Sequence, residues 1–310
     1  MQDQAPPYAY SCFGLSIRSA IALPEIAEDS SPADGGRPAI AITIGPVPSE
    51  LPGAPPPAHG VQASGDDILL TVKDVARYLI RGGREIVVDA SAGGGARSIR
   101  LFLLGSAFGV LCYQRGLLLL HANAIVARGE VVAFAGRSGA GKSTLAAHFQ
   151  SAGYQVLCDD VCVVSFDEGG RPLAWPGLPR LKLWREAASS FGHDCEMLEP
   201  AIDGLEKYNV PLAAAARGGL YPLRRLYVLS ALAPGATGQI TRLRGAAAVE
   251  AVLAQSYRGQ YLKPMGLLQR HFAHCSGLLR HVEVYSAPRE WGYDVFTREA
   301  GKLERHLLET

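Results

Sequence analysis

The sequence predicts an α/β fold with a mixed central sheet and a small β-rich N-terminal domain. Two observations lead to this prediction. A glycine-rich loop pattern at residues 136–143 lies between a strand-like run and a helix-like run. Residues 1–97 hold short β-branched runs separated by Gly, Pro, Ser and Asp clusters. We therefore divide the chain into a β-rich region, residues 1–97, and an α/β domain, residues 98–310.

The glycine-rich loop matches the full G-x-x-x-x-G-K-[ST] pattern and reads Gly136-Arg137-Ser138-Gly139-Ala140-Gly141-Lys142-Ser143. Glu130–Ala135 before it predicts a strand, and Lys142–Ser151 after it predicts a helix closed by Gly153. Backbone N–H groups at such a helix start bind phosphate oxygens. We expect the loop and Thr144 to bind ATP, with Lys142 at the β/γ-phosphates and Ser143 on Mg²⁺. An ordinary glycine turn is the alternative, and eight constrained positions disfavour it.

Composition limits the class of protein. The 310 residues are 48% hydrophobic and 19% charged, and the net charge is +1. This balance indicates a globular chain and predicts neither a nucleic-acid partner nor an anionic membrane surface. The six cysteines form no C-x-x-C pair, and the first residues show no targeting pattern, so we expect reduced thiols in the cytoplasm. The apolar run Leu101–Tyr113 is shorter than the ~20 residues of a spanning helix, which favours a buried core helix.

The predicted elements before the loop follow from composition. Ser98–Gln114 predicts an apolar helix, and Leu117–Ala127 predicts a strand that carries His121 and Asn123. This strand can pair with the one that feeds the loop as a hairpin, which would make the central sheet mixed. In the N-terminal region the predicted strands are Tyr8–Ile17, Ala39–Ile44, Ile68–Val72 and Glu85–Asp89.

An acidic doublet, Asp159-Asp160, lies within the next predicted strand, Tyr154–Phe166. The helix carries the chain roughly 15 Å away from the loop, and five strand residues of about 3.3 Å each bring it back. The doublet should therefore lie level with the bound phosphates. Two carboxylates in an apolar strand are costly unless they are paired or bind a cation. One can attend Mg²⁺ while the other accepts a proton from an attacking hydroxyl, as phosphoryl transfer requires.

Residues after the doublet carry weaker signals. In Leu178–Trp184 the alternation places Arg180 and Lys182 on one face, which is either solvated or binds an anion. Lys207 gives a similar signal. The remaining predicted elements are a strand at Leu223–Leu232, helices at Ala246–Ser256 and within Pro264–His281, a strand at Val282–Tyr285 and a helix at Thr297–Leu308.

The loop, the doublet and His121 together resemble the HPr kinase/phosphorylase family, whose catalytic domain has a phosphate-loop fold also seen in phosphoenolpyruvate carboxykinases. That family shows a His on the strand before the loop, then G-x-x-G-x-G-K-S, then a D-D doublet. The resemblance implies that Ser143 holds Mg²⁺ and that Asp159 is the base that activates a serine. It further implies that His121 and Asp160 support the catalytic site with Lys142. In the mechanism that we expect, Asp160 holds the metal together with Ser143.

The chain departs from that family after the doublet, where the family's glutamate-bearing signature is absent, so the resemblance by itself implies neither a second metal ligand nor the reverse phosphorolysis. Three further segments, Tyr10–Ile17, Arg115–Ala122 and Pro179–Trp184, are similar to HPr-kinase-related proteins that include kinases of lasso-peptide precursors. This implies an ATP- and Mg²⁺-dependent kinase of a peptide or protein serine, such as the C-terminal serine of a lasso-peptide precursor. Related kinases are homo-oligomers.

Three alternatives stay open at the level of the sequence. The first is an HPr-type bifunctional kinase/phosphorylase, the second a kinase of a small metabolite, and the third a nucleotide-gated binding module that transfers no phosphate. A transporter ATPase would need an L-S-G-G-Q-like signature, which the chain lacks.

Overall fold

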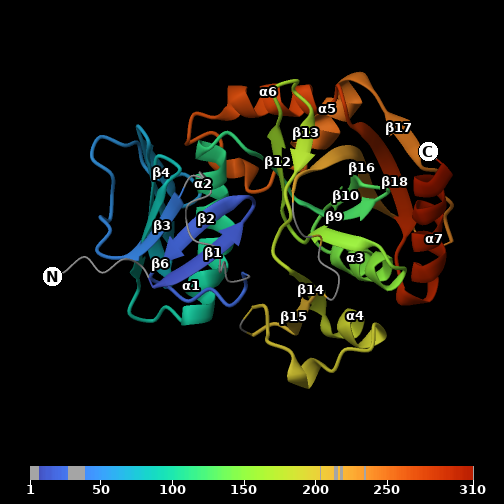
Figure 1. Cartoon of the computed structure of the whole chain (residues 1–310), viewed down its shortest axis with the longest axis horizontal. Coiled ribbons are helices and arrows are strands. Elements are labelled where there is room, and N and C mark those ends of the chain that lie inside the picture. Colours follow the sequence, from blue (N-terminus) through green and yellow to red (C-terminus); the bar gives the residue numbers. More distant parts are fainter. Residues whose placement is uncertain are drawn as a thin grey trace. The chain divides into compact units, whose positions relative to one another are not determined.

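The computed structural model describes residues 7–26, 39–202, 204–212, 216, 219–233 and 235–309 (Figure 1). The first six residues, part of the stretch in which we expect no targeting signal, lie outside these ranges. The chain divides into two compact units. Unit 1 comprises residues 1–119, 200–206 and 257–272, and unit 2 comprises residues 120–199, 207–256 and 273–310.

Unit 1 contains a seven-stranded mixed sheet in the order β1-β2-β3-β7-β6-β5-β4. β2 pairs with β3, and β3 with β7, in parallel, whereas the other pairs are antiparallel. The strand predicted over Tyr8–Ile17 is a hairpin instead, because Phe13 and Gly14 turn the chain with φ of 51° and 70°. The strands are β1 (Tyr8–Cys12), β2 (Leu15–Ser19), β3 (Ala39–Ile44), β4 (Val61–Ser64), β5 (Asp67–Val72), β6 (Ala76–Arg81) and β7 (Glu85–Ala90).

The predicted apolar helix forms part of unit 1 and runs through α1 (Ala96–Phe102), a π-helical turn (Leu103–Ala107) and α2 (Phe108–Gln114). The Tyr78 hydroxyl donates a hydrogen bond to a carbonyl of α1, and the last side chain of α2 accepts one from Gly83. By length and composition alone this helix could cross a membrane, with a mean hydropathy of 1.3, but half of that window is buried. Because the helix is bonded to the sheet, the units divide after residue 119 and not at the predicted position 97.

Unit 2 is built on a nine-stranded mixed sheet in the order β11-β9-β10-β16-β13-β12-β8, with β18 beside β16 and β17 beside β18. β10, β16 and β18 are parallel, and β9 is antiparallel to β10. The predicted hairpin and the predicted mixed sheet are therefore confirmed. The strands are β8 (Leu118–Leu120), β9 (Ala122–Ala127), β10 (Glu130–Gly136), β11 (Gln155–Cys158), β12 (Cys162–Phe166), β13 (Pro172–Ala174), β16 (Tyr221–Leu232), β17 (Thr241–Leu243) and β18 (Glu283–Glu290).

A separate two-stranded sheet and the helices complete the chain. The sheet pairs β14 (Arg180–Trp184) with β15 (Lys207–Pro211). The helix predicted after the loop is α3, and its bounds agree with the prediction. The helices are α3 (Lys142–Ser151), α4 (Arg185–Ser190), α5 (Gly245–Leu253), α6 (Leu268–Leu278) and α7 (Tyr293–Glu309), with short 3₁₀ turns at Cys195–Met197 and Gly259–Tyr261. All six cysteines lie among the described residues, where they are buried and form no disulfide.

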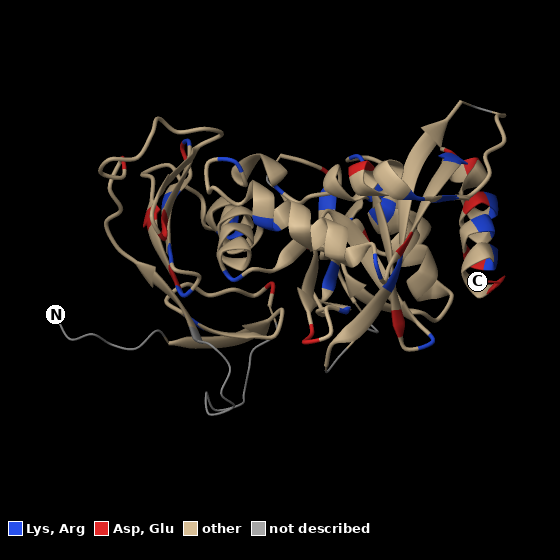
Figure 2. Cartoon of the chain, turned by 90° about the horizontal axis from the view of Figure 1, so that it is seen from above, with Lys and Arg blue, Asp and Glu red and all other residues tan. Residues whose placement is uncertain are grey.

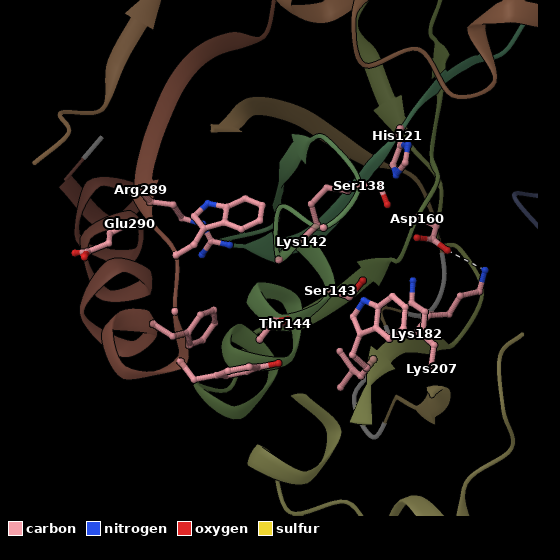
Figure 3. A pocket seen from close by; sticks show the side chains of 18 residues that line it. His121, Ser138, Lys142, Ser143, Thr144, Asp160, Lys182, Lys207, Arg289 and Glu290 are labelled. Atoms are coloured by element: carbon pink, nitrogen blue, oxygen red, sulfur yellow. Dashed lines mark hydrogen bonds and ion pairs between the residues drawn. The ribbon is translucent and has the colours of Figure 1, made fainter. Parts of the chain in front are cut away.

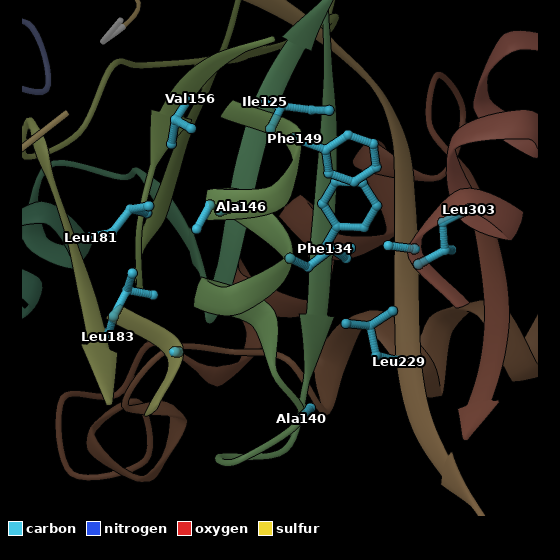
Figure 4. Packing of buried hydrophobic residues seen from close by; sticks show 14 of the residues in the cluster. Ile125, Phe134, Ala140, Ala146, Phe149, Val156, Leu181, Leu183, Leu229 and Leu303 are labelled. Carbon is cyan, nitrogen blue, oxygen red and sulfur yellow. The ribbon is translucent and has the colours of Figure 1, made fainter. Parts of the chain in front are cut away.

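An aromatic core holds α3 against the sheet of unit 2 (Figure 4). The Phe134 ring on β10 stacks on Phe149 of α3 at 5.2 Å and on Tyr227 of β16 at 5.6 Å. Leu303 of α7 is buried in the same cluster. This packing fixes the end of β10 relative to the start of α3, so the glycine loop between them is held at both ends.

Basic and acidic side chains alternate along α7, next to the C-terminal label in Figure 2.

Two predicted strands are interrupted at their polar residues. The run Tyr154–Phe166 breaks between β11 and β12, and Asp159 and Asp160 occupy the bend. The run Leu117–Ala127 breaks at His121, between β8 and β9. In a continuous strand neighbouring side chains alternate between the two faces of the sheet, which would bury one carboxylate of the doublet among apolar side chains. The bend lets both carboxylates find polar partners.

Candidate functional site

A cavity of about 410 Å³ opens beside the glycine loop of unit 2 (Figure 3). Its walls come from four parts of the chain: the loop and the start of α3, the two bends that carry His121 and Asp160, the strands β14 and β15, and the segment from the end of β18 into the first turn of α7. The sequence predicted the first two walls as parts of the site. Only the packing of unit 2 reveals the fourth.

The loop has the backbone that its glycines permit. Gly136, Gly139 and Gly141 have φ of 148°, 82° and 67°, a region that other residues rarely adopt. A Cβ on Gly136 would lie 2.8 Å from the Leu229 carbonyl oxygen of β16. No side chain caps the start of α3, and its first turn is free of acidic residues. Backbone N–H groups at this helix start are therefore available to an anion.

Lys142 lies along the loop and lines the cavity, with only 6% of its surface exposed. Its Nζ donates to the carbonyl oxygens of Gly136 at 2.9 Å and Arg137 at 3.3 Å. Burial lowers the pKa of Lys142, and the nearby Asp160 and Asp159 carboxylates oppose that shift. The Lys142 ammonium group is thus held by the carbonyl oxygens of the loop. It lies at the position where the sequence predicts the β/γ-phosphates.

Asp159 is bonded to the loop. Its carboxylate accepts hydrogen bonds from the Ser143 hydroxyl at 3.0 Å, from the Asn123 amide at 2.6 Å and from the backbone N–H of Lys182 at 2.6 Å. Burial and the neighbouring Asp160 charge raise the pKa of Asp159 to about 6. From the lengths of the helix and the strand we expected the doublet to lie level with the phosphate loop. The hydrogen bond between Ser143 and Asp159 agrees with that expectation. Asp159 does not line the cavity, whereas its neighbour does.

Asp160 faces the cavity from a left-handed backbone conformation with φ of 65°. Its carboxylate pairs with Lys182 Nζ at 2.8 Å (Figure 3). Burial alone would raise the pKa of Asp160, but Lys182, Lys207 and His121 hold it well below its usual range. The sequence left Lys182 either solvated or bound to an anion; its side chain is largely buried and pairs with a carboxylate of the doublet. His121 lines the same wall.

Arg289 is a site residue that the sequence analysis missed. It lies at the end of β18, which continues five residues beyond the predicted strand, and it is 6% exposed. The guanidinium donates to the Ala140 carbonyl oxygen of the loop at 2.6 Å, and its Nε has no hydrogen-bond partner among the described residues. Burial lowers its pKa to about 10. Because β10, β16 and β18 are parallel, their carboxyl ends meet at one edge, but no local signal in the sequence reveals this pairing.

The oxygen atoms beside Ser143 suit a magnesium ion. The Ser143 hydroxyl and the Asp159 carboxylate are 3.0 Å apart, and the Asn123 Oδ1 next to them is buried with no hydrogen-bond partner in the described part of the chain. Mg²⁺ prefers oxygen ligands and takes one or two carboxylates, with waters and phosphate oxygens completing its shell. The described residues contain no group of three His, Cys, Asp or Glu side chains placed to hold a metal.

Comparisons with known proteins add little to this geometry. No family model and no curated protein matches the chain. Among solved structures, the chain is similar to one described as the Hpr(Ser) kinase/phosphatase from Coxiella burnetii, with 13% identity over 62% of this chain and 91% of that chain and a TM-score of 0.31.

Proposed function

We propose that this chain is a Mg²⁺- and ATP-dependent kinase that transfers the γ-phosphoryl group to a serine hydroxyl of a peptide or protein. The observation that carries the proposal is the contact between Ser143 of the loop and Asp159, with Asp160 beside it facing the cavity. Two carboxylates beside the glycine loop, one hydrogen-bonded to the loop and one lining the cavity, support this proposal. An ordinary glycine turn requires neither carboxylate.

The proposed roles follow the hydrogen bonds. The backbone N–H groups at the start of α3 and the Lys142 ammonium bind the triphosphate and stabilise the charge that develops on it. Ser143 and Asp159 would hold Mg²⁺, which neutralises charge on the phosphate oxygens when it is bound. This exchanges the roles expected for the doublet, in which Asp160 was the metal ligand and Asp159 the base.

Two observations support the exchange. Asp159 uses both carboxylate oxygens in hydrogen bonds to the protein, including one to Ser143, and it does not line the cavity. Asp160 does line it, so it can accept the proton of an incoming hydroxyl while Lys182 keeps its carboxylate ionised and oriented. A low pKa is compatible with this role, because a loose phosphoryl-transfer transition state requires positioning more than base strength.

For the acceptor we propose a serine of a peptide or protein, and in particular the C-terminal serine of a lasso-peptide precursor, which the sequence resemblance implies. The reducing cytoplasm is the proposed location, supported by six buried cysteines that form no disulfide. Lys182, Lys207 and His121 surround Asp160 and would lie near the acceptor.

The proposal is tested by incubating the protein with γ-labelled ATP, Mg²⁺ and serine-containing peptides, followed by mass mapping of the modified residue. Free serine and HPr-like proteins serve as competing acceptors and separate the small-metabolite and HPr-type alternatives. We expect transfer to a peptide serine, with Asp160→Asn reducing turnover at least ~100-fold while ATP affinity changes less than about threefold. Binding of ATP with no transfer to any acceptor would instead favour the nucleotide-gated binding module.

A second arm separates the two aspartates. If Asp159 is the metal ligand, Asp159→Asn raises the Mg²⁺ concentration required for half-maximal transfer, whereas Asp160→Asn leaves that concentration unchanged. The opposite pattern would restore the roles first expected for the doublet.

A further inference from the structure

The segment Arg289–Phe296, which runs from the end of β18 into the first turn of α7, carries aromatic side chains that the proposed transfer does not use. Trp291 and Tyr293 both line the cavity, and 41% and 57% of their surfaces are exposed. Large aromatic side chains exposed at the wall of a cavity present apolar surface to water and gain no packing contacts in return. A ligand ring that covers them would recover that free energy.

The order of groups along the cavity indicates which part of a ligand would reach this segment. Figure 3 shows His121, Asp160 and Lys182 on one side, Arg289 and Glu290 on the other, and Lys142 between them. The phosphoryl group to be transferred must lie next to Asp160. A nucleotide bound to the loop with its γ-phosphate there therefore extends its nucleoside toward Arg289 and the residues that follow.

The segment is anchored on both sides of its exposed rings. Arg289 donates to the Ala140 carbonyl of the loop at 2.6 Å, and the Glu290 carboxylate accepts from Arg298 at 2.6 Å and from the Gly235 N–H at 2.7 Å. On the other side, the Phe296 ring and a histidine ring of α3 are nearly perpendicular, with centroids 5.6 Å apart. The rings are thus presented by a backbone that is already fixed, so a ligand would lose little free energy in ordering them.

We propose that Trp291 and Tyr293 bind the nucleobase of the phosphoryl donor by stacking, so that the donor is a nucleoside triphosphate and not an inorganic polyphosphate. This inference rests on the proposed function and specifies its donor. The cavity volume of about 410 Å³ is in the range of small-molecule sites. Stacking does not depend on the hydrogen-bonding groups of a base, so ATP and GTP bind with similar affinity.

Isothermal titration with MgATP, MgGTP and magnesium tripolyphosphate tests the inference, because tripolyphosphate has the phosphates without the base. We expect Trp291→Ala to weaken binding of both nucleotides about tenfold and to leave tripolyphosphate binding unchanged. Trp291→Phe keeps an aromatic face and should retain most of the affinity. Tyr293→Ala provides a second variant if Trp291→Ala folds poorly, and Phe272→Ala, 51% exposed and outside the cavity, is the matched control.

The outcomes separate this inference from the proposed function. Equal loss of affinity for nucleotides and tripolyphosphate, or no loss for any of them, would overturn the stacking role. Wild-type protein that binds tripolyphosphate as tightly as ATP would also overturn it, while the phosphate site would stand. Protein that binds neither ATP nor tripolyphosphate would refute the proposed function, and the inference with it.

Discussion

Replacing Gly141 with alanine should destabilise unit 2 through two separable effects. The residue has φ of 67°, and left-handed backbone costs a non-glycine residue roughly 1–2 kcal/mol. In addition, the new Cβ would lie 2.5 Å from the Arg289 guanidinium and displace it from the Ala140 carbonyl, and the loss of such a charge-assisted hydrogen bond costs about 2 kcal/mol. We therefore expect Gly141→Ala to lower the free energy of unfolding by about 3 kcal/mol.

Gly139→Ala is the matched control in the same loop. Its φ of 82° imposes similar backbone strain, but nothing lies within 4 Å of the added Cβ, so the expected loss is about 1 kcal/mol. Combining Gly141→Ala with Arg289→Met removes the clash, so the double variant should be more stable than the sum of the two single losses predicts, by about 2 kcal/mol.

Urea unfolding followed by tryptophan fluorescence measures these differences, because all three tryptophans lie in unit 2. The explanation fails if Gly141→Ala and Gly139→Ala lose equal stability, or if the Gly141 and Arg289 substitutions are additive. Either result would mean that the guanidinium does not limit the space at Gly141.

Three further predictions follow from the charges at the site. Lys182→Met should cost about 2 kcal/mol of unfolding free energy at pH 7 by leaving the half-buried Asp160 carboxylate unpaired. Because the folded pKa of Asp160 is depressed, this difference is fully present above its unfolded pKa of ~4 and shrinks as the pH falls below that value, which urea titrations at pH 7 and pH 3 would reveal. Lys142→Met should weaken MgATP binding at least about tenfold and also reduce turnover, measured by titration and label transfer. Chelation of Mg²⁺ should abolish transfer yet leave the unfolding midpoint of the nucleotide-free protein unchanged, because protein donors already satisfy Asp159.

Much of the fold around the loop could be predicted from local sequence. The strand before Gly136, the helix Lys142–Ser151 and the antiparallel hairpin before the loop agree with the structure. In these segments the spacing of apolar residues and the positions of glycines determine the strand, helix or turn. Both can be recognised within a few neighbouring residues. The same holds for β14, where Leu181 and Leu183 are buried as the alternation predicted.

Prediction was less accurate where polar side chains override a local pattern. The apolar residues on both sides of Asp159 and Asp160 predicted one continuous strand, but the hydrogen bonds of the doublet to Ser143 and Lys182 bend the chain there. In the N-terminal region the turn at Phe13 and Gly14 interrupted a run that was predicted as one strand. In both cases partners or backbone conformations beyond simple periodicity decided the outcome.

The sequence by itself determined the phosphate-loop pattern, the presence of a carboxylate pair at the right distance along the chain, and the mixed character of the sheet. Only the tertiary structure decided which aspartate contacts Ser143 and which faces the cavity, and only it brought Arg289 and Trp291 to the loop from more than a hundred residues away. The physical reason is that strand order and bends depend on long-range pairing and burial, whereas helices, turns and glycine loops depend on neighbours in the chain.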